Sequence, residues 1–158
     1  MSDVASSAWI APGAHVGGAV RLGDDVSVWY GAAVRAEMAE IVIGARSNVQ
    51  DNAVIHVDEG FGVQLGEDVT IGHGAIVHGC SVGANTVIGM GSIVLNGAKV
   101  GENCIVGAGA LVTQGMVIPA GSVAFGSPAR VVRAIRPEEI EANRRNADHY
   151  VELARAQR

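Results

Sequence analysis

Three histidines, His56, His73 and His78, have the side-chain type and the spacing to bind a metal ion. Imidazole nitrogens are common ligands of zinc and of other divalent metals. All three lie inside a long run of six-residue repeats, and the repeat sets the face on which each side chain points outward. Two of them fall on one face and the third on another. They can therefore share one ion only if a second copy of the chain supplies the third ligand.

The repeat predicts the fold. Stretches such as "IGHGAI", "IGMGSI" and "VGAGAL" begin with an aliphatic residue that is followed by glycine. A unit of this length suits one short strand and one tight turn, in which a small residue helps the chain to bend. Three units would form one triangular turn of a parallel β-solenoid, so we predict a mainly β protein with the aliphatic residues stacked inside. These residues are Ile10, Val16, Leu22, Val28, Val34, Ile43, Val49, Ile55, Leu65, Ile71, Val77, Val82, Ile88, Val94, Val100, Val106, Val112 and Ile118.

Two steps of the repeat are longer than the others. One runs from Val34 to Ile43, and the other runs from Ile55 to Leu65 and contains "VDEGFGVQ". The second begins beside His56 and is predicted to bulge outward as a small loop. Loops on solenoids cluster on the binding face, which favours a site near this position.

The C-terminal part of the chain leaves the repeat and predicts a helix. Arg136-Pro137-Glu138-Glu139 has proline in the first turn and acidic residues that favour the N-terminal end of the helix dipole. We expect a helix from about Pro137 to Ala156 that folds back along the solenoid. The predicted organisation is a β-helix domain over residues 1–135, with the C-terminal helix of residues 136–158 as part of the same single domain.

Composition restricts the class of protein. The chain has 158 residues, 22 glycines and only 17% charged residues, which suits a glycine-rich solenoid. A net charge of -5 argues against nucleic acid as a partner. No apolar stretch is long enough to span a membrane and no signal peptide is present, so we expect a cytoplasmic protein. Cys80 and Cys104 show no metal or disulfide spacing and are interpreted as small thiols in a reducing compartment.

The face of each outward residue follows from the repeat. One column on the second face reads Arg35, His56, His78, with a spacing of about 4.8 Å between neighbouring strands. His73 belongs to the first face, in a column with Asp51. A threefold axis would bring the first face of one chain against the second face of the next, where His73 could join the other two. Three protein nitrogens with an open fourth position are typical of catalytic zinc.

Other polar residues lie near the same predicted interface. Arg35 would face Asp51 of the neighbouring chain, as an interface ion pair. Gln50 would either form a hydrogen bond at the interface or orient a metal-bound water. Asn96, two places after Val94, is interpreted either as a residue of the site or as a turn residue. His15 and His149 lie outside this group and are expected to be solvated.

Several stretches identify a family. "WYGAAVRAE", "NVQDNAVIHV" and "IGHGAIVHGC", followed by "IGMGSIV" and "GSPARVVR", resemble γ-class carbonic anhydrases of the hexapeptide-repeat superfamily, over about residues 8–135. The resemblance implies a left-handed parallel β-helix and a homotrimer with three interfacial sites. It also implies that His56 and His78 come from one subunit and His73 from its neighbour, around Zn²⁺ or alternatively Fe²⁺ or Co²⁺.

The chain departs from the family in two places. Arg35-Ala36-Glu37 stands where members often have Arg-x-Asp, and a short loop replaces a long acidic loop that carries a proton-shuttling glutamate. That loop offers only Asp58 and Glu59 as acids, and Glu59 is either a shuttle or an exposed loop acid. Tyr150 is either a core residue or a site residue, because the family places polar groups of the C-terminal helix near the site.

The resulting functional hypothesis is the reversible hydration of CO2 to bicarbonate by a metal-bound hydroxide at subunit interfaces. Two alternatives remain open. One is an acyl-CoA thioesterase or acyltransferase-like protein that uses the same interfacial site. The other is a metal-binding scaffold with slow catalysis.

Overall fold

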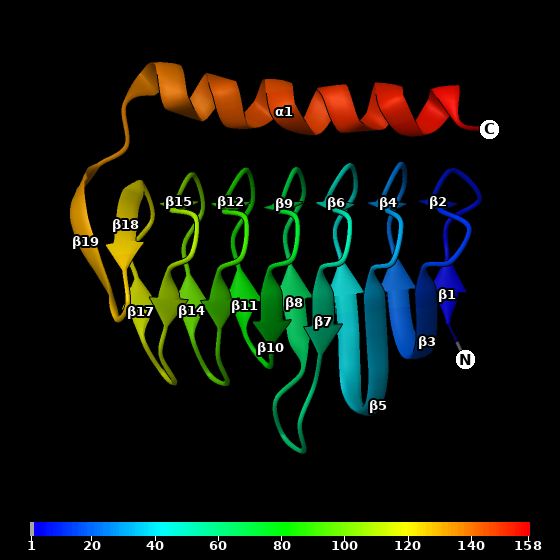
Figure 1. Cartoon of the computed structure of the whole chain (residues 1–158), viewed down its shortest axis with the longest axis horizontal. Helices are drawn as coiled ribbons and strands as arrows, with labels where there is room; N and C mark the ends of the chain where they lie inside the picture. Colours follow the sequence, from blue (N-terminus) through cyan, green and yellow to red (C-terminus); the bar gives the residue numbers. More distant parts are fainter. Residues whose placement is uncertain (1) are drawn as a thin grey trace.

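The computed structural model describes residues 2–158, which form a parallel β-solenoid with one long helix along it (Figure 1). Most turns contribute three strands, and the strands of successive turns pair in parallel, as at Val49 with Ile71 and at Ile55 with Val77. The predicted mainly β solenoid with a C-terminal helix is confirmed. No helix within residues 2–158 is long and apolar enough to cross a membrane.

One face of the solenoid is an eight-stranded sheet. Its strands are β2 (Trp9–Ile10), β4 (Ser27–Val28), β6 (Asn48–Val49), β9 (Thr70–Ile71), β12 (Val87–Ile88), β15 (Ile105–Val106), β18 (Ser122–Gly126) and β19 (Ala129–Ala134).

The other two faces join into one 11-stranded sheet, because the long strand β5 (Ala33–Ile43) continues from one to the other. Its start pairs with β7 and its end pairs with β8, so the long step after Val34 is a continuous strand. The remaining strands are β1 (Asp3–Val4), β3 (His15–Leu22), β7 (Val54–His56), β8 (Val63–Leu65), β10 (Ile76–His78), β11 (Ser81–Val82), β13 (Ile93–Val94), β14 (Lys99–Val100), β16 (Leu111–Val112) and β17 (Val117–Ile118).

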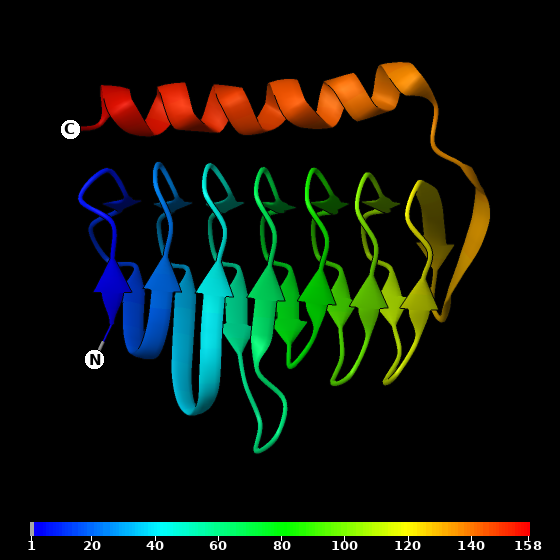
Figure 2. The ribbon, with the colours of Figure 1, turned by 180° about the vertical axis from the view of Figure 1, so that it is seen from behind.

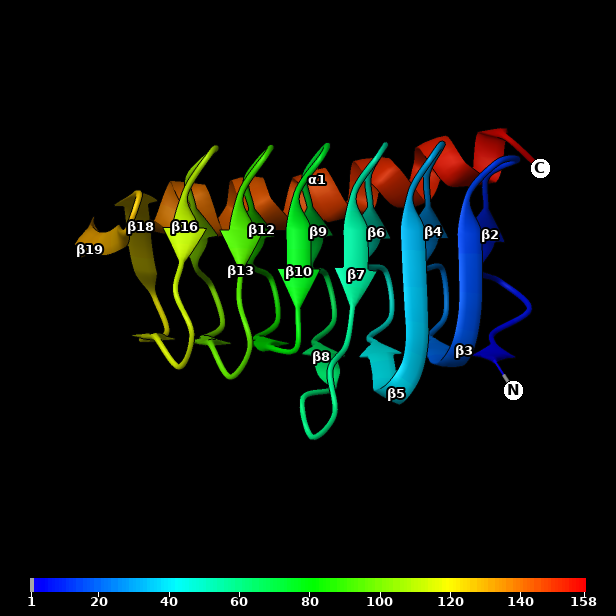
Figure 3. The same cartoon turned by 60° about the horizontal axis from the view of Figure 1, so that its bottom comes forward.

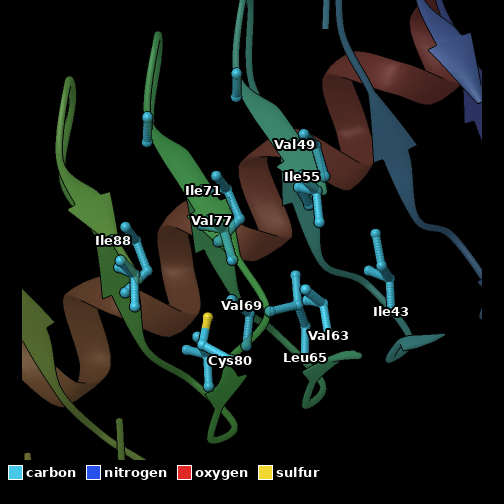
Figure 4. Packing of buried hydrophobic residues seen from close by; sticks show 14 of the residues in the cluster. Ile43, Val49, Ile55, Val63, Leu65, Val69, Ile71, Val77, Cys80 and Ile88 are labelled. Atoms are coloured by element: carbon cyan, nitrogen blue, oxygen red, sulfur yellow. The ribbon is translucent and has the colours of Figure 1, made fainter. Parts of the chain in front are cut away.

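The core consists of the stacked aliphatic residues of successive turns (Figure 4). Ile55, Leu65 and Ile71 are fully buried, one from each face. The glycine that follows many of these residues has a different role from the predicted bend. A Cβ on Gly44 would lie 2.5 Å from the carbonyl carbon of Gly66 in the next turn. A side chain is therefore excluded by the close approach of neighbouring turns.

The second long step forms the predicted outward loop between β7 and β8 (Figure 3). Backbone hydrogen bonds from Asp58 N to Phe61 O (3.1 Å) and from Phe61 N to Asp58 O (2.9 Å) close it. At the other end, the stretch after the last repeat forms an antiparallel hairpin, β18 and β19, which the repeat did not predict. This hairpin covers the end of one sheet and leads the chain into the helix.

Helix α1 (Pro137–Ala156) has the predicted bounds and runs back along the eight-stranded sheet (Figure 2). Glu139 accepts a hydrogen bond from the backbone N–H of Arg136 at 2.9 Å, which satisfies a donor at the helix start. Ion pairs with Arg133 and then Arg136 hold the pKa of Glu139 well below its usual range. On the inner side, Asn143 Nδ2 donates to the carbonyl oxygens of Asn85 and Cys104, which fixes the helix on the turns of the solenoid.

We expect Ile43→Ala to lower the free energy of unfolding by about 2–5 kcal/mol, because it removes buried methyl groups and leaves a cavity. Ile43 is 1% exposed, whereas Ile10 at the end of the solenoid is 37% exposed. Ile10→Ala is therefore the matched control and should have a much smaller effect. Urea unfolding at equal protein concentration measures both, and equal losses for the two variants would contradict the packing described here.

Candidate metal centre

His56 and His78 lie side by side on the second face, as the repeat predicted. Strands β7 and β10 pair in register, with His78 opposite His56, and Arg35 of β5 is the next residue in the same column. The ring centroids are 5.1 Å apart, and Nδ1 of His56 is 3.0 Å from Nε2 of His78. Two imidazole nitrogens from successive turns therefore converge on one point.

The other nitrogen of each ring faces an oxygen. His56 Nε2 is 3.1 Å from Oε2 of Glu37, and His78 Nδ1 is 2.6 Å from Oδ1 of Asn96. These oxygens accept hydrogen bonds, so each ring places its hydrogen on the outer nitrogen. The two inner nitrogens lie at hydrogen-bonding distance, so either a proton or a metal cation can lie between them.

The separation of the two inner nitrogens suits two ligands of one ion. Zinc–nitrogen bonds of 2.0–2.1 Å in a tetrahedral site place two ligand nitrogens roughly 3.3 Å apart. The observed 3.0 Å needs only a small side-chain adjustment to reach this value. The donor set of the pair therefore fits zinc, and it equally fits other divalent metals that bind imidazole.

His73 lies away from this pair within one chain. It follows β9 on the eight-stranded sheet, where its Nδ1 is 3.1 Å from Oδ2 of Asp51 and its side chain is 47% exposed. Among residues 2–158, no group of three or more His, Cys, Asp or Glu side chains is arranged to hold an ion. The distribution of the three histidines over two faces thus agrees with the repeat.

Glu37 is a site residue that the sequence analysis treated only as a departure from the family pattern. It pairs with Arg35 on its own strand and, through its longer side chain, reaches His56 on the next. The pKa of Glu37 lies below its usual value. Partial loss of hydration, the largest single effect, acts to raise it, but hydrogen bonds from its own backbone N–H and from His56, together with the charge of Arg35, outweigh that effect. The sequence carried one signal for this contact. Side chains two residues apart on a strand point to the same face, which places Glu37 on the same side as Arg35.

Gln50 lies beside His73 in a cavity of about 310 Å³ between the eight-stranded sheet and α1. Its Nε2 donates to Oδ1 of Asn48 at 3.1 Å, and Nδ2 of Asn48 donates to Thr70 at 3.0 Å. Asn146 of the helix donates to the same threonine oxygen at 2.9 Å. This chain of hydrogen bonds, which the sequence analysis missed, orients Gln50 through its Nε2 and leaves its Oε1 free to accept.

The other predicted residues divide between the two faces. Tyr150 of α1 lines the same cavity as Gln50, with its ring edge-on to Trp29 at 5.4 Å. Glu59 is exposed at the turn of the loop after β7. Within one chain Asp51 pairs with His73, and Arg35 pairs with Glu37.

Burial, and secondarily the negative charge of Asp51, raise the pKa of Tyr150, because both disfavour the phenolate. We expect ultraviolet titration, with Tyr150→Phe identifying the signal, to show a midpoint above that of free tyrosine. Asp51→Asn removes a negative charge and should lower this midpoint, whereas Asp24→Asn, whose carboxylate does not contribute to the shift, should leave it unchanged. A midpoint at or below that of free tyrosine would contradict this environment.

The chain is similar to carbonic anhydrases and to hexapeptide-repeat proteins. The family described as "Bacterial transferase hexapeptide (six repeats)" matches residues 79–114. A probable carbonic anhydrase of Methanocaldococcus jannaschii is 50% identical over 92% of this chain and 91% of its own length. Gamma carbonic anhydrase 1 of Arabidopsis thaliana mitochondria is 40% identical over 97% of this chain, which spans 58% of that longer protein. The crystal structure of a hexapeptide transferase family protein from Anaplasma phagocytophilum superposes with a TM-score of 0.93 at 37% identity, over 98% of this chain and 92% of that one. The chain therefore belongs to the γ-class carbonic anhydrase-like family of the hexapeptide-repeat, left-handed parallel β-helix superfamily.

Proposed function

We propose that the chain is a cytoplasmic, homotrimeric γ-class carbonic anhydrase that hydrates CO2 reversibly at its subunit interfaces. His56 and His78 of one subunit and His73 of the next would hold one Zn²⁺, with Fe²⁺ or Co²⁺ as alternatives. The observation that carries this proposal is the pair of imidazole nitrogens that face each other at 3.0 Å, with the outer nitrogen of each ring beside an acceptor oxygen. The family relationship supports the same reaction.

The surfaces beside the histidines support a trimer. Val54 and Ile76 are neighbours on the second face, 37% and 38% exposed. On the side of His73, Tyr30 and Met90 are 43% and 58% exposed. Apolar side chains left open on both faces suit an interface in which the first face of one subunit covers the second face of the next.

The same contact would assemble an ion pair between Arg35 and Asp51 of the neighbouring subunit. Both side chains are partly exposed, at 53% and 37%, and are available to a partner. A charge-assisted contact of this kind sets the register between subunits. It would join the His73 side of one subunit to the His56 side of the next.

Each side chain then has a role in hydration. A bound divalent ion lowers the pKa of water toward neutrality and so supplies a nucleophile. Gln50, held by Asn48, would accept a hydrogen bond from that water and orient it toward CO2. Tyr150 forms the opposite wall of the cavity. Glu59, exposed beside the site, would carry the released proton to solvent.

Action on an acyl-CoA, as a thioesterase or an acyltransferase-like protein, is the second candidate, supported by the similarity to a putative acetyltransferase of Bacillus cereus. A water nucleophile at the same interfacial site could attack an acyl-CoA carbonyl. The two reactions therefore share the metal ligands and differ in the substrate that the cavity accepts.

We expect the zinc form or an anaerobically prepared Fe²⁺ form to accelerate CO2 hydration in stopped-flow measurements, and His56→Ala to lose at least about 100-fold because an ion ligand is removed. The control His15→Ala, outside the site, should retain full activity. A thiol-release assay with several acyl-CoAs separates the second candidate. Hydration at the buffer rate with both metals, or acyl-CoA hydrolysis that depends on His56 without CO2 hydration, would overturn carbonic anhydrase activity.

Mixed trimers test whether the site is shared between subunits. His73→Ala and His78→Ala chains should each be inactive alone. Coexpressed, they should regain activity at about one quarter of the interfaces, where an intact histidine pair meets an intact His73. His56→Ala with His78→Ala is the matched control and should show no recovery, because the pair must come from one chain. No recovery in the first mixture, with trimers confirmed by light scattering, would contradict an interfacial site.

A further inference from the structure

The loop between β7 and β8 is tied to the turns that follow it. Phe61 packs beside Gly79 and Gly97, and a Cβ on Gly79 would lie only 2.8 Å from the Cβ of Phe61. The hydrogen bonds between Asp58 and Phe61 close the loop into a tight turn. The loop projects from the solenoid (Figure 3). Phe61 nevertheless gives it a defined position beside the turn that follows His78.

Asn96 lies between this loop and His78. Its Nδ2 donates to Oδ2 of Asp58 at 3.2 Å, and its Oδ1 is 2.6 Å from Nδ1 of His78. A carboxylate can only accept hydrogen bonds, so Asp58 requires the amino end of the Asn96 amide. The oxygen end must then face His78. Because an amide oxygen only accepts, Nδ1 of His78 must carry the hydrogen.

We infer that Asn96, oriented by Asp58, is a positioning residue that holds His78 in the tautomer with a free Nε2. The hydrogen bond at one imidazole nitrogen determines which tautomer is present, and such partners also orient a ligating ring. Nε2 is the nitrogen that faces His56. The inference rests on the proposed metal site for its purpose, although the tautomer itself is a property of the metal-free chain.

This assigns the short loop a task different from proton transfer. Asp58, rather than Glu59, is connected to His78, and the connection runs through its hydrogen bond with Asn96. The closed turn and the packing of Phe61 hold Asp58 at the distance this contact needs. The loop thereby sets, in the chain without metal, which nitrogen of one candidate ligand carries the hydrogen.

The test uses the full-length protein with ¹⁵N-labelled histidine and no metal. Two-bond ¹H–¹⁵N correlation spectra should show His78, identified with His78→Gln, protonated at Nδ1 in the wild type and in Asn96→Asp, which keeps an acceptor. Asn96→Leu should give a mixture of tautomers, and so should Asp58→Ala, which frees the amide to turn. Gln114→Leu, at the equivalent place one turn later and exposed, is the matched control and should leave the tautomer unchanged.

Zinc affinity, measured by competition with a chelator, gives the second readout. Asn96→Leu should weaken binding by about 10–100-fold, and Asn96→Asp should restore most of it. An unchanged tautomer in both Asn96→Leu and Asp58→Ala would overturn the inference. Asp58→Ala changes an exposed loop residue, so it tests the inference even if Asn96→Leu does not fold. If the wild type binds no zinc while its tautomer still depends on Asn96, the positioning role stands and the proposed metal function fails.

Discussion

In-register stacking of parallel strands is the constraint on which the rest of the structure depends. Each turn of the solenoid lies directly on the one before it, so residues at equivalent positions of the repeat form columns at strand spacing. The same stacking puts Ile55 over Val77 inside and His56 beside His78 outside. The hydrophobic core and the candidate metal centre are thus two consequences of one register. A slip of one residue would reverse both, because successive side chains point to opposite faces.

The candidate site gains its character from the groups that surround the two histidines. Glu37, on strand β5, accepts a hydrogen bond from the outer nitrogen of His56. Asn96, in the turn after β13, accepts one from the outer nitrogen of His78. Their hydrogen bonds leave the other two nitrogens facing each other, where a proton or a metal cation can lie between them. A partner oxygen that also orients the ring is the usual support for a ligating histidine. The departure from the family pattern at Glu37 therefore adds a contact to the site.

The helix contributes to a different part of the site. Helix α1 folds back over the eight-stranded sheet (Figure 1). It thereby brings Asn146 and Tyr150 from the end of the chain to the cavity that Gln50 and His73 also line. A buried polar relay through Thr70 and Asn48 connects the helix to Gln50. The cavity on this face and the histidine pair on the other are separate within one protomer. A trimer would bring the cavity of one subunit beside the histidine pair of the next, and this is the physical reason for proposing that the active assembly is a trimer.

The sequence by itself determined the solenoid, the three faces, the outward loop, the bounds of the helix and the pairing of His56 with His78. The helix follows from its start signals at Pro137, Glu138 and Glu139. The other features follow from periodicity, because a fixed repeat converts position along the chain into position in space. Only the tertiary structure decided that the last repeats end in the β18–β19 hairpin, that Glu37 reaches His56, that Asn96 orients His78 rather than merely completing a turn, and that Asp58 is the loop acid at the site. The reason is physical. A repeat gives the direction of a side chain, whereas its partner depends on side-chain length, rotamer and the path of a loop that leaves the repeat.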